Sequence, residues 1–310
     1  MSIFKTNYLI IGAAAFVLLG MWNCAPERAV KLDPETAEFY ETTRLIMTDD
    51  EKDIFNHLPS NELRKEFIQE FWEKRDPDPD TEVNEFKQEY FRRIEYANER
   101  YNEGTPGWKT DRGRIYVYLG APDKIDEIFN HDATDSNGDP IRGSLLLWVY
   151  YRYDFAVQFY DKSGIGHFTM DPYYGVIGDI FLAIEKAKMG MGFKDEEFRS
   201  SFWDFDLEYD VSAQEFRLEI PAEDLIFKEE EGLLKADFQV EFFIYPDDGS
   251  GKFEFKDTIN FEEEEQELLK KEKINFTFPY QLSPGKYKVD VVIIAEPDVG
   301  RSRKIFNIKV

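Results

Sequence analysis

Few residue types in this sequence could do chemistry at a defined place. The 63 aspartates and glutamates are so numerous that composition cannot single out one carboxylate pair. The three histidines, His57, His131 and His167, do not stand at metal-ligand spacings, and a single cysteine excludes an internal disulfide or a cysteine-based metal cluster. The sequence contains no Gly-x-Ser-x-Gly elbow, phosphate-binding loop or dinucleotide fingerprint. We therefore expect no catalytic residue and no resident cofactor.

Two acidic segments could hold Ca²⁺, which prefers several oxygen ligands. The candidate ligands are Asp76, Asp78 and Asp80 in the first segment and Asp135, Asn137 and Asp139 in the second. The first segment is stiffened by two prolines and extended, so its alternate side chains project along a line rather than around an ion. The second resembles a fragment of a calcium loop but lacks the downstream bidentate glutamate. A helix stop and an Asn-Gly turn are the favoured interpretations.

The first 24 residues have the pattern of a signal sequence that ends at the only cysteine. Lys5 precedes an apolar run over residues 8–22, which suits a signal peptide and is short for a membrane-spanning helix of ~20 residues. Cys24 stands where a bacterial lipoprotein signal places its diacylated cysteine. We predict a signal peptide at 1–24, a lipid on Cys24 and a tether at 25–32. The bulky residues 21–23 leave two alternatives open, an uncleaved N-terminal anchor and ordinary secretion.

The charge of the chain limits its partners. The formal net charge is −25 and the sequence pI is about 4.6. Such a field repels phosphate backbones and anionic lipid headgroups, which argues against nucleic-acid binding and charge-driven adhesion to membranes. We expect membrane attachment through the N-terminal lipid and other envelope proteins as partners.

Residues 33–101 carry helix signals. N-cap residues, a proline in the first turn and apolar positions three and four apart all favour helices here. The predicted helices begin at Asp33 and Pro34, cover 49–57, run from the N-cap Ser60 to about 74, and run from the N-cap Asp80 or Thr81 to 101.

Residues 107–123 join this helical part to a predicted sheet. Ile115, Val117 and Leu119 alternate with polar or aromatic residues, which predicts a half-buried strand at 114–119. A polar loop is expected at 127–143. Further strands are predicted at 145–151, 155–160 and 166–170, and a helix at 179–189. We therefore predict an α+β domain at 33–190, with helices packed on a small antiparallel sheet.

The C-terminal part is rich in strand signals. Seven short segments with turn residues between them predict an all-β, Ig-like sandwich domain at 200–310. They are 203–209, 214–220, 234–244, 252–260, 273–279, 285–295 and 302–309. The glutamate run at 262–265 is interpreted as a solvated turn or frayed helix between strands.

The segment Gly107-Trp108-Lys109-Thr110-Asp111 matches the signature of the GWxTD-domain proteins. The similarity extends to Phe71-Trp72-Glu73-Lys74-Arg75-Asp76-Pro77-Asp78-Pro79-Asp80-Thr81, to Asn84-Glu85-Phe86, to Tyr96-Ala97-Asn98 and to Asp111-Arg112-Gly113-Arg114-Ile115-Tyr116. This resemblance implies a bacterial envelope protein without an assigned activity, often with a lipoprotein signal and a C-terminal Ig-like domain. The family has no known catalytic residues to carry over.

The signature and its flanks supply the remaining candidate site residues, which are Trp108, Asp111, Arg112, Arg114 and Asp123. Charges placed between helices and sheet must be paired. We therefore expect a buried ion-pair network tying the fourth helix to the predicted central strand, with a ligand pocket as the alternative.

The predicted function is a non-catalytic, lipid-anchored cell-envelope protein, periplasmic or at the cell surface, that acts in protein or glycan interaction and assembly. One alternative is a hydrolase that uses clustered carboxylates in the first domain, and another is a purely structural envelope spacer.

Overall fold

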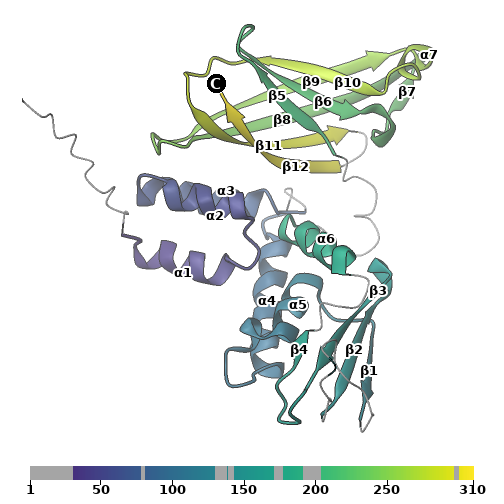
Figure 1. Cartoon of the computed structure of the whole chain (residues 1–310). Helices are drawn as coiled ribbons and strands as arrows, with labels where there is room; N and C mark the ends of the chain where they lie inside the picture. The colour runs from purple at the N-terminus through teal and green to yellow at the C-terminus, as the bar shows by residue number, and fades with distance from the viewer. Residues whose placement is uncertain are drawn as a thin grey trace, which may run out of the picture. The chain divides into compact units, whose positions relative to one another are not determined.

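Figure 1 shows a computed structural model of the chain, which describes residues 31–77, 81–129, 138, 143–170, 177–190, 204–296 and 300–310. Leu32–Val310 form one compact unit. A helical N-terminal region is followed by a β-rich C-terminal region built from antiparallel sheets. Within the described ranges, no helix is long and apolar enough to cross a membrane. The signal peptide and Cys24 lie outside these ranges.

The first three helices begin where their capping residues predict. Helices α1 (Pro34–Thr43) and α3 (Asn61–Glu73) have the predicted N-caps Asp33 and Ser60. Helix α2 (Asp49–His57) begins at Thr48, whose hydroxyl accepts the Glu51 N–H while the Glu51 carboxylate accepts the Thr48 N–H. This reciprocal capping satisfies two backbone donors that the helix itself leaves free.

Helix α4 (Glu85–Arg100) begins later than predicted. Its N-cap is Asn84, whose side chain accepts the Lys87 N–H at 2.8 Å. Thr81, one of the predicted caps, instead donates its hydroxyl to the Val83 carbonyl at 2.9 Å, and Asp80 is outside the described residues. The prediction was wrong because asparagine caps a helix as well as aspartate does and stood closer to the apolar repeat.

Residues 114–119, predicted as the central strand, are helical. They belong to α5 (Asp111–Leu119), which follows the short 3₁₀ helix η1 (Gly107–Lys109). The side chain of Thr110 caps α5 by accepting the Gly113 N–H, and Gly120 ends the helix at φ +80°. The helix is buried around most of its circumference, so the apolar residues alternate with buried aromatic ones. The strand prediction was wrong because a period of two also arises on a helix with several buried faces.

A four-stranded antiparallel sheet does form in this region, but its first strand is β1 (Lys124–Ile128), which was not predicted and overlaps the start of the loop expected at 127–143. It pairs with β2 (Leu145–Tyr150), then β3 (Phe155–Tyr160) and the short β4 (Thr169–Met170). The 3₁₀ turn η2 (Tyr151–Tyr153) joins β2 to β3. Helix α6 (Ile177–Lys188) follows.

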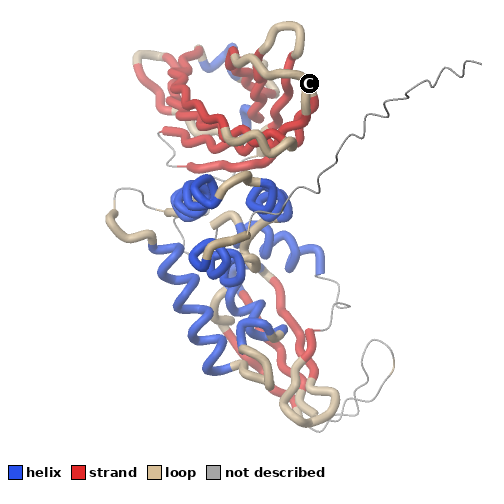
Figure 2. The backbone as a smooth tube through the Cα atoms, turned by 90° about the vertical axis from the view of Figure 1, so that its left-hand side faces the viewer, coloured by secondary structure: helices blue, strands red, loops and turns tan. Residues whose placement is uncertain are grey.

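Aromatic side chains fill the space between these helices and the sheet. Trp148 on β2 is 1% exposed and packs edge-on against Phe159, with ring centroids 4.9 Å apart. Tyr101, which follows α4, contacts Trp148 at 5.3 Å and Tyr116 of α5 at 5.6 Å. Figure 2 shows these helices alongside the four-stranded sheet.

Two further antiparallel sheets make up the C-terminal region. A three-stranded sheet has the order β10-β6-β5, and a five-stranded sheet has the order β12-β11-β8-β7 with β9 also paired to β8. The larger sheet curls into a half-barrel (Figure 2). The strands are β5 (Asp206–Asp210), β6 (Glu215–Pro221), β7 (Lys228–Glu230), β8 (Leu233–Pro246), β9 (Phe253–Glu263), β10 (Lys273–Pro279), β11 (Lys286–Glu296) and β12 (Gly300–Lys309).

The two sheets share one apolar core. Phe216 and Phe278 from the smaller sheet meet Phe242 from the larger one, and all three are no more than 1% exposed. The seven predicted segments correspond to strands, while the three-residue β7 was not predicted. The glutamate run spans the end of β9 and the start of the one-turn helix α7 (Glu265–Leu268).

Candidate functional site

The GWxTD segment makes close backbone contacts that only glycine allows. A Cβ atom added to Gly107 would lie 1.8 Å from the Ala97 carbonyl oxygen of α4. One added to Gly113 would lie 1.8 Å from the Gly107 carbonyl oxygen. Thr110 donates its hydroxyl to that same carbonyl at 2.8 Å. The glycines therefore bring α4, η1 and α5 into direct backbone contact.

The charged residues of this segment bind the stretch that leads into β4. Arg112 makes an ion pair with Glu103 at 2.7 Å, and the Glu103 side chain is only 2% exposed. Glu103 also accepts the Phe168 N–H at 3.0 Å. The Asp111 carboxylate accepts the Met170 N–H at 2.9 Å.

The structure therefore does not pair Asp111 with Arg112. Asp111 instead bonds Arg114 at 2.6 Å, while Arg112 stacks over the Phe168 ring with its guanidinium carbon 4.0 Å from the ring centroid. Because residues 111–119 are helical, these contacts join a helix to residues 167–170 rather than α4 to a central strand.

Trp108 and Asp123 have separate positions. Trp108 is partly buried against the helical core, donates its backbone N–H to Asn98 at 3.4 Å, and lies under the side chains of Arg44 and Lys109. Asp123 accepts the Tyr151 N–H at 2.7 Å and so fixes the end of the β1–β2 pair.

The calcium candidates are mostly outside the described residues, which exclude Asp78, Asp80, Asp135, Asn137 and Asp139. The backbone carbonyl of Asp76 accepts a hydrogen bond from Arg301 at 3.3 Å. Among the described residues, no group of His, Cys, Asp and Glu side chains is arranged to hold a metal ion.

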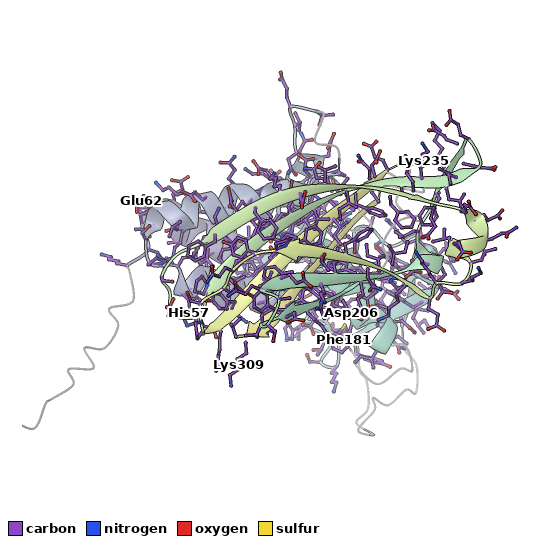
Figure 3. All side chains as sticks on the ribbon, turned by 90° about the horizontal axis from the view of Figure 1, so that it is seen from above. His57, Glu62, Phe181, Asp206, Lys235 and Lys309 are labelled. Atoms are coloured by element: carbon purple, nitrogen blue, oxygen red, sulfur yellow. The ribbon has the colours of Figure 1, made fainter. Side chains whose placement is uncertain are left out.

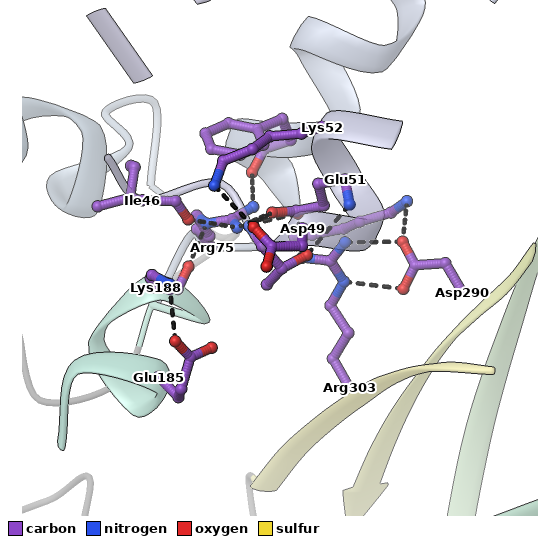
Figure 4. Close-up of polar contacts among 12 residues, drawn as sticks. Ile46, Asp49, Glu51, Lys52, Arg75, Glu185, Lys188, Asp290 and Arg303 are labelled. Carbon is purple, nitrogen blue, oxygen red and sulfur yellow. Dashed lines mark hydrogen bonds and ion pairs between the residues drawn. The ribbon is translucent and has the colours of Figure 1, made fainter. Parts of the chain in front are cut away.

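The most concentrated group of buried charges was missed by sequence reasoning. Five charged residues, each no more than 5% exposed, meet where α2 and the end of α3 approach strands β11 and β12. They are Glu51, Lys74, Arg75, Asp290 and Arg303, and we call them the junction cluster (Figure 4).

Each member of the junction cluster bonds a member of opposite charge. Glu51 accepts from Arg75 at 2.7 Å and lies 2.8 Å from a terminal nitrogen of Arg303. Arg303 donates two parallel hydrogen bonds to Asp290, both at 2.8 Å, and Lys74 donates a third at 2.9 Å. Bidentate Arg–carboxylate pairs of this kind are the strong, directional form of ion pair.

A second set of polar contacts extends the junction cluster toward solvent. Glu70 accepts the Tyr245 hydroxyl at 3.1 Å and bonds both Lys74 and Lys252. The Lys74 ammonium also lies 3.4 Å from the centroid of the Phe243 ring. Lys74 is thus surrounded by two carboxylates and an aromatic face, which together compensate its burial.

The pKa values follow from this pairing. Burial by itself would raise the pKa of Glu51, but the charges of Arg75 and Arg303 outweigh burial and hold it below its ordinary value. Burial likewise opposes ionisation of Asp290, and the charges of Arg303 and Lys74 again lower its pKa. Burial lowers the pKa of Lys74. Both carboxylates are therefore held in the ionised form.

One sequence signal could have led to this cluster. Asp290 interrupts the apolar run from Val289 to Ala295 in a strand that is buried along most of its length. A lone carboxylate in such a strand requires a cationic partner. One partner, Arg303, is only 13 residues away on the neighbouring strand, whereas Lys74 is 216 residues away and could not be deduced.

A groove of about 310 Å³ opens beside the junction cluster, between α3 and strands β8 and β9. Its carboxylates face cations: Glu241 bonds Lys256 at 2.7 Å, and Glu254 bonds Lys252 at 3.0 Å. The groove can hold a small polar molecule or water, and Glu70, Glu241 and Glu254 on its walls are each paired with a lysine.

Comparison with known proteins gives one family match. The GWxTD domain family model matches residues 33–134, and no curated protein matches the chain. A family 76 glycoside hydrolase from a bovine Bacteroides thetaiotaomicron strain aligns at 11% identity over 34% of this chain and 20% of that chain, with a TM-score of 0.20. A hypothetical protein from Pyrococcus horikoshii aligns at 13% identity over 37% of this chain and 93% of that chain, with a TM-score of 0.23. This chain thus spans about a fifth of the hydrolase, and neither likeness carries an argument about function.

The described helices α1 to α5 and strand β1 lie within the residues matched by the family model, and the chain contains a GWxTD domain at 33–134.

Proposed function

We propose that this protein is a non-catalytic, lipid-anchored component of the bacterial cell envelope that acts in protein or glycan interaction and assembly. The observation that carries the proposal is the pairing of the buried carboxylates with buried cations. Glu51 and Asp290 are each bonded to two cations and held ionised, so they join the helical and β-rich regions rather than transferring protons to a substrate.

This arrangement weakens the case for a carboxylate hydrolase. A general acid in a hydrolase needs a raised pKa, so that it is protonated near neutral pH. The pKa values of Glu51 and Asp290 are lowered instead. The groove carboxylates Glu241 and Glu254 face lysines rather than one another.

The proposed location rests on the N-terminal sequence. Residues 8–22 are apolar and precede the only cysteine, and we propose that Cys24 carries the lipid that attaches the protein to a periplasmic or surface-exposed membrane face. We further propose that the two C-terminal sheets form an Ig-like sandwich, which would offer strand edges and loops for recognition.

Mass spectrometry and affinity capture test the proposal. The wild-type chain should lose residues 1–23, gain lipid on Cys24 and recover stoichiometric partners from solubilised envelopes. The Cys24→Ser chain should lack the lipid and leave the membrane fraction. An unmodified Cys24 in native protein would contradict the anchor, and capture of no partner would favour the structural-spacer alternative.

A further inference from the structure

The long strand β9 has one neighbour in the part of the chain that the structure describes. It pairs with β8 along its whole length, from Phe253 opposite Ile244 to Glu263 opposite Leu234. Strand β10 pairs only with β6 and does not continue the ladder from β9. Side chains alone cross between them, including the stacked rings of Phe255 and Tyr280, 4.8 Å apart.

The ladder register identifies which backbone groups of β9 are unused. The Asp247 N–H donates to the Lys286 carbonyl at 2.9 Å, directly beyond the β8–β11 pairing of Pro246 with Tyr287. In an antiparallel ladder, hydrogen bonding alternates from residue to residue. Odd-numbered residues of β8 therefore bond to β11, and even-numbered residues bond to β9.

The same register identifies which residues of β9 bond to β8. Its odd-numbered residues bond to β8, and its even-numbered residues direct their N–H and C=O groups away from the sheet. These are Glu254, Lys256, Thr258, Asn260 and Glu262, all of which are exposed. The Thr258 N–H donates to the side chain of the neighbouring Asp257 at 2.8 Å, as expected for a donor that no strand engages.

An unpaired edge of this length is a template for another strand, and charged residues usually protect such edges from self-association. Asp257 provides that protection on β9. It lies on the same face of the strand as Phe255 and Ile259, and a charge at this position discourages a second apolar edge from packing there.

The charge around β9 selects the partner. Residues 253–265 contain six carboxylates and one lysine, within a chain whose net charge is −25. Lysines of this chain pair with three of the six, Glu254, Glu262 and Glu263, so the excess charge comes from the others and from the chain as a whole. A second copy would be repelled, and antiparallel pairing of two copies about Thr258 would place Glu254 opposite Glu262. A positively charged strand would be attracted. A backbone carbonyl of the incoming strand would accept the Thr258 N–H in place of the Asp257 carboxylate, and the freed carboxylate could then pair with a lysine of that strand.

We infer that the free edge of β9 binds an extended, lysine- or arginine-rich segment of a partner protein by adding it as a further antiparallel strand. The five even-numbered residues supply the backbone hydrogen bonds, and Asp257 together with the net negative charge of the chain selects the basic segment. Lys235, labelled in Figure 3, bonds Glu262 at 3.0 Å and marks the end of this surface. The inference rests on the proposed interaction function and names the surface and the class of partner.

The test uses the full-length chain and a fluorescent nonapeptide in which lysine alternates with valine around a central threonine. The control peptide has glutamate in place of lysine. We expect the lysine peptide to bind and the glutamate peptide to bind at least about tenfold more weakly. Equal binding of the two peptides would overturn the inference.

Paired variants at one position separate backbone pairing from simple charge attraction. Thr258→Pro removes an N–H of the free edge without removing a bond to β8, and proline is tolerated at such an edge position. Thr258→Val keeps the N–H and serves as the matched control. We expect unchanged binding for Thr258→Val and about fivefold or greater weakening for Thr258→Pro, since the lost group is a backbone hydrogen bond. Equal affinity of the two variants would refute strand addition.

A second variant and a direct measurement protect the test against misfolding. Asn260→Pro removes the next free N–H and should weaken binding similarly if Thr258→Pro does not fold. Amide hydrogen exchange should show new protection at Thr258 and Asn260 when the lysine peptide binds. Protection that instead appears with rising protein concentration and no peptide would identify a second copy as the occupant and overturn the inference.

Affinity capture from envelopes distinguishes this inference from the proposed function. Partners lost with Thr258→Pro and kept with Thr258→Val would support both. Partners kept equally by both variants would leave the interaction function standing and refute the role of β9. Peptide binding without any captured partner would support the β9 surface and count against the proposed function.

Discussion

Replacing Asp290 by asparagine tests whether the junction cluster stabilises the fold. The carboxylate accepts three hydrogen bonds from two buried cations, at 2.8, 2.8 and 2.9 Å. Asparagine keeps the shape but offers one oxygen, and its amide hydrogens would face the donors of Arg303 or Lys74. Breaking a buried ion pair by removing one partner costs ~3–5 kcal/mol. Here Arg303 would keep only Glu51 and Lys74 only Glu70 as counter-charges, so the buried cations would be under-compensated.

That loss should be large enough to measure by thermal unfolding. In a unit of this size, 1 kcal/mol shifts the melting temperature by roughly 2 °C, so Asp290→Asn should melt about 6–10 °C below wild type at pH 7. Glu267→Gln is the matched control, since it removes the same charge from an ion pair in which both side chains are more than half exposed. Exposed pairs contribute ~0–1 kcal/mol, so its melting temperature should change by no more than about 2 °C.

The same pair of proteins should show a specific pH dependence. The pKa of Asp290 is below its ordinary value of 3.8 in the folded protein. Its contribution to stability is therefore complete above that ordinary value and is lost as pH falls through the lower folded-state pKa. The difference in melting temperature between wild type and Asp290→Asn should be constant from pH 7 to about pH 5 and narrow below about pH 4. A shift at pH 7 no larger than that of Glu267→Gln would refute the reasoning.

Two further predictions concern the GWxTD segment. Arg112→Ala should lower the melting temperature by roughly 6 °C or more, because Glu103, whose side chain is 2% exposed, would lose its arginine partner and keep only the neighbouring His167. Arg114→Ala, whose side chain is 51% exposed, should change the melting temperature by no more than about 2 °C, and equal shifts would contradict this account. Gly113→Ala should prevent native packing of α5, because its Cβ would lie 1.8 Å from the Gly107 carbonyl oxygen, and a native circular dichroism spectrum and wild-type melting curve would show that the backbone can move aside.

Local signals predicted much of the secondary structure correctly. Asp33 and Ser60 cap the helices they were expected to cap, and strands such as β3 and β10 have the predicted bounds. These features depend on residues close together in sequence, and their physical cause is present in a short window.

The segment after Thr110 was mispredicted because two local signals conflicted. Threonine followed by aspartate is a helix start, and the alternating apolar residues are a strand signal. The close contact of Gly107 and Gly113 with neighbouring backbone decides for the helix, and that contact exists only in the folded chain. The expected small antiparallel sheet still forms, because β1 provides the strand that residues 114–119 were predicted to form.

The junction cluster could not be predicted for a different reason. Its members come from α2, the end of α3, β11 and β12, and apart from the neighbouring strands β11 and β12 the helical and strand residues that meet there are far apart in sequence. The Arg112–Glu103 pair was closer to prediction, since Arg112 was expected in a buried network, but Glu103 is one of many carboxylates and nothing marked it as the partner. Buried charge pairs are a property of the tertiary fold, and sequence indicates only that a partner is required.

Buried charges that are already paired stabilise the fold of this protein, whereas exposed backbone groups without a neighbouring strand are available to a partner. In the junction cluster, Glu51 and Asp290 are each bonded to two cations, so a ligand could bind there only by breaking those bonds in a buried space. The even-numbered residues of β9 are exposed, and the register leaves their backbone groups to solvent or to Asp257. An incoming strand would replace water and the exposed Thr258–Asp257 bond, and this exchange costs less than opening the junction cluster. Interaction at β9 is therefore compatible with a stable fold, whereas interaction at the buried charges is not.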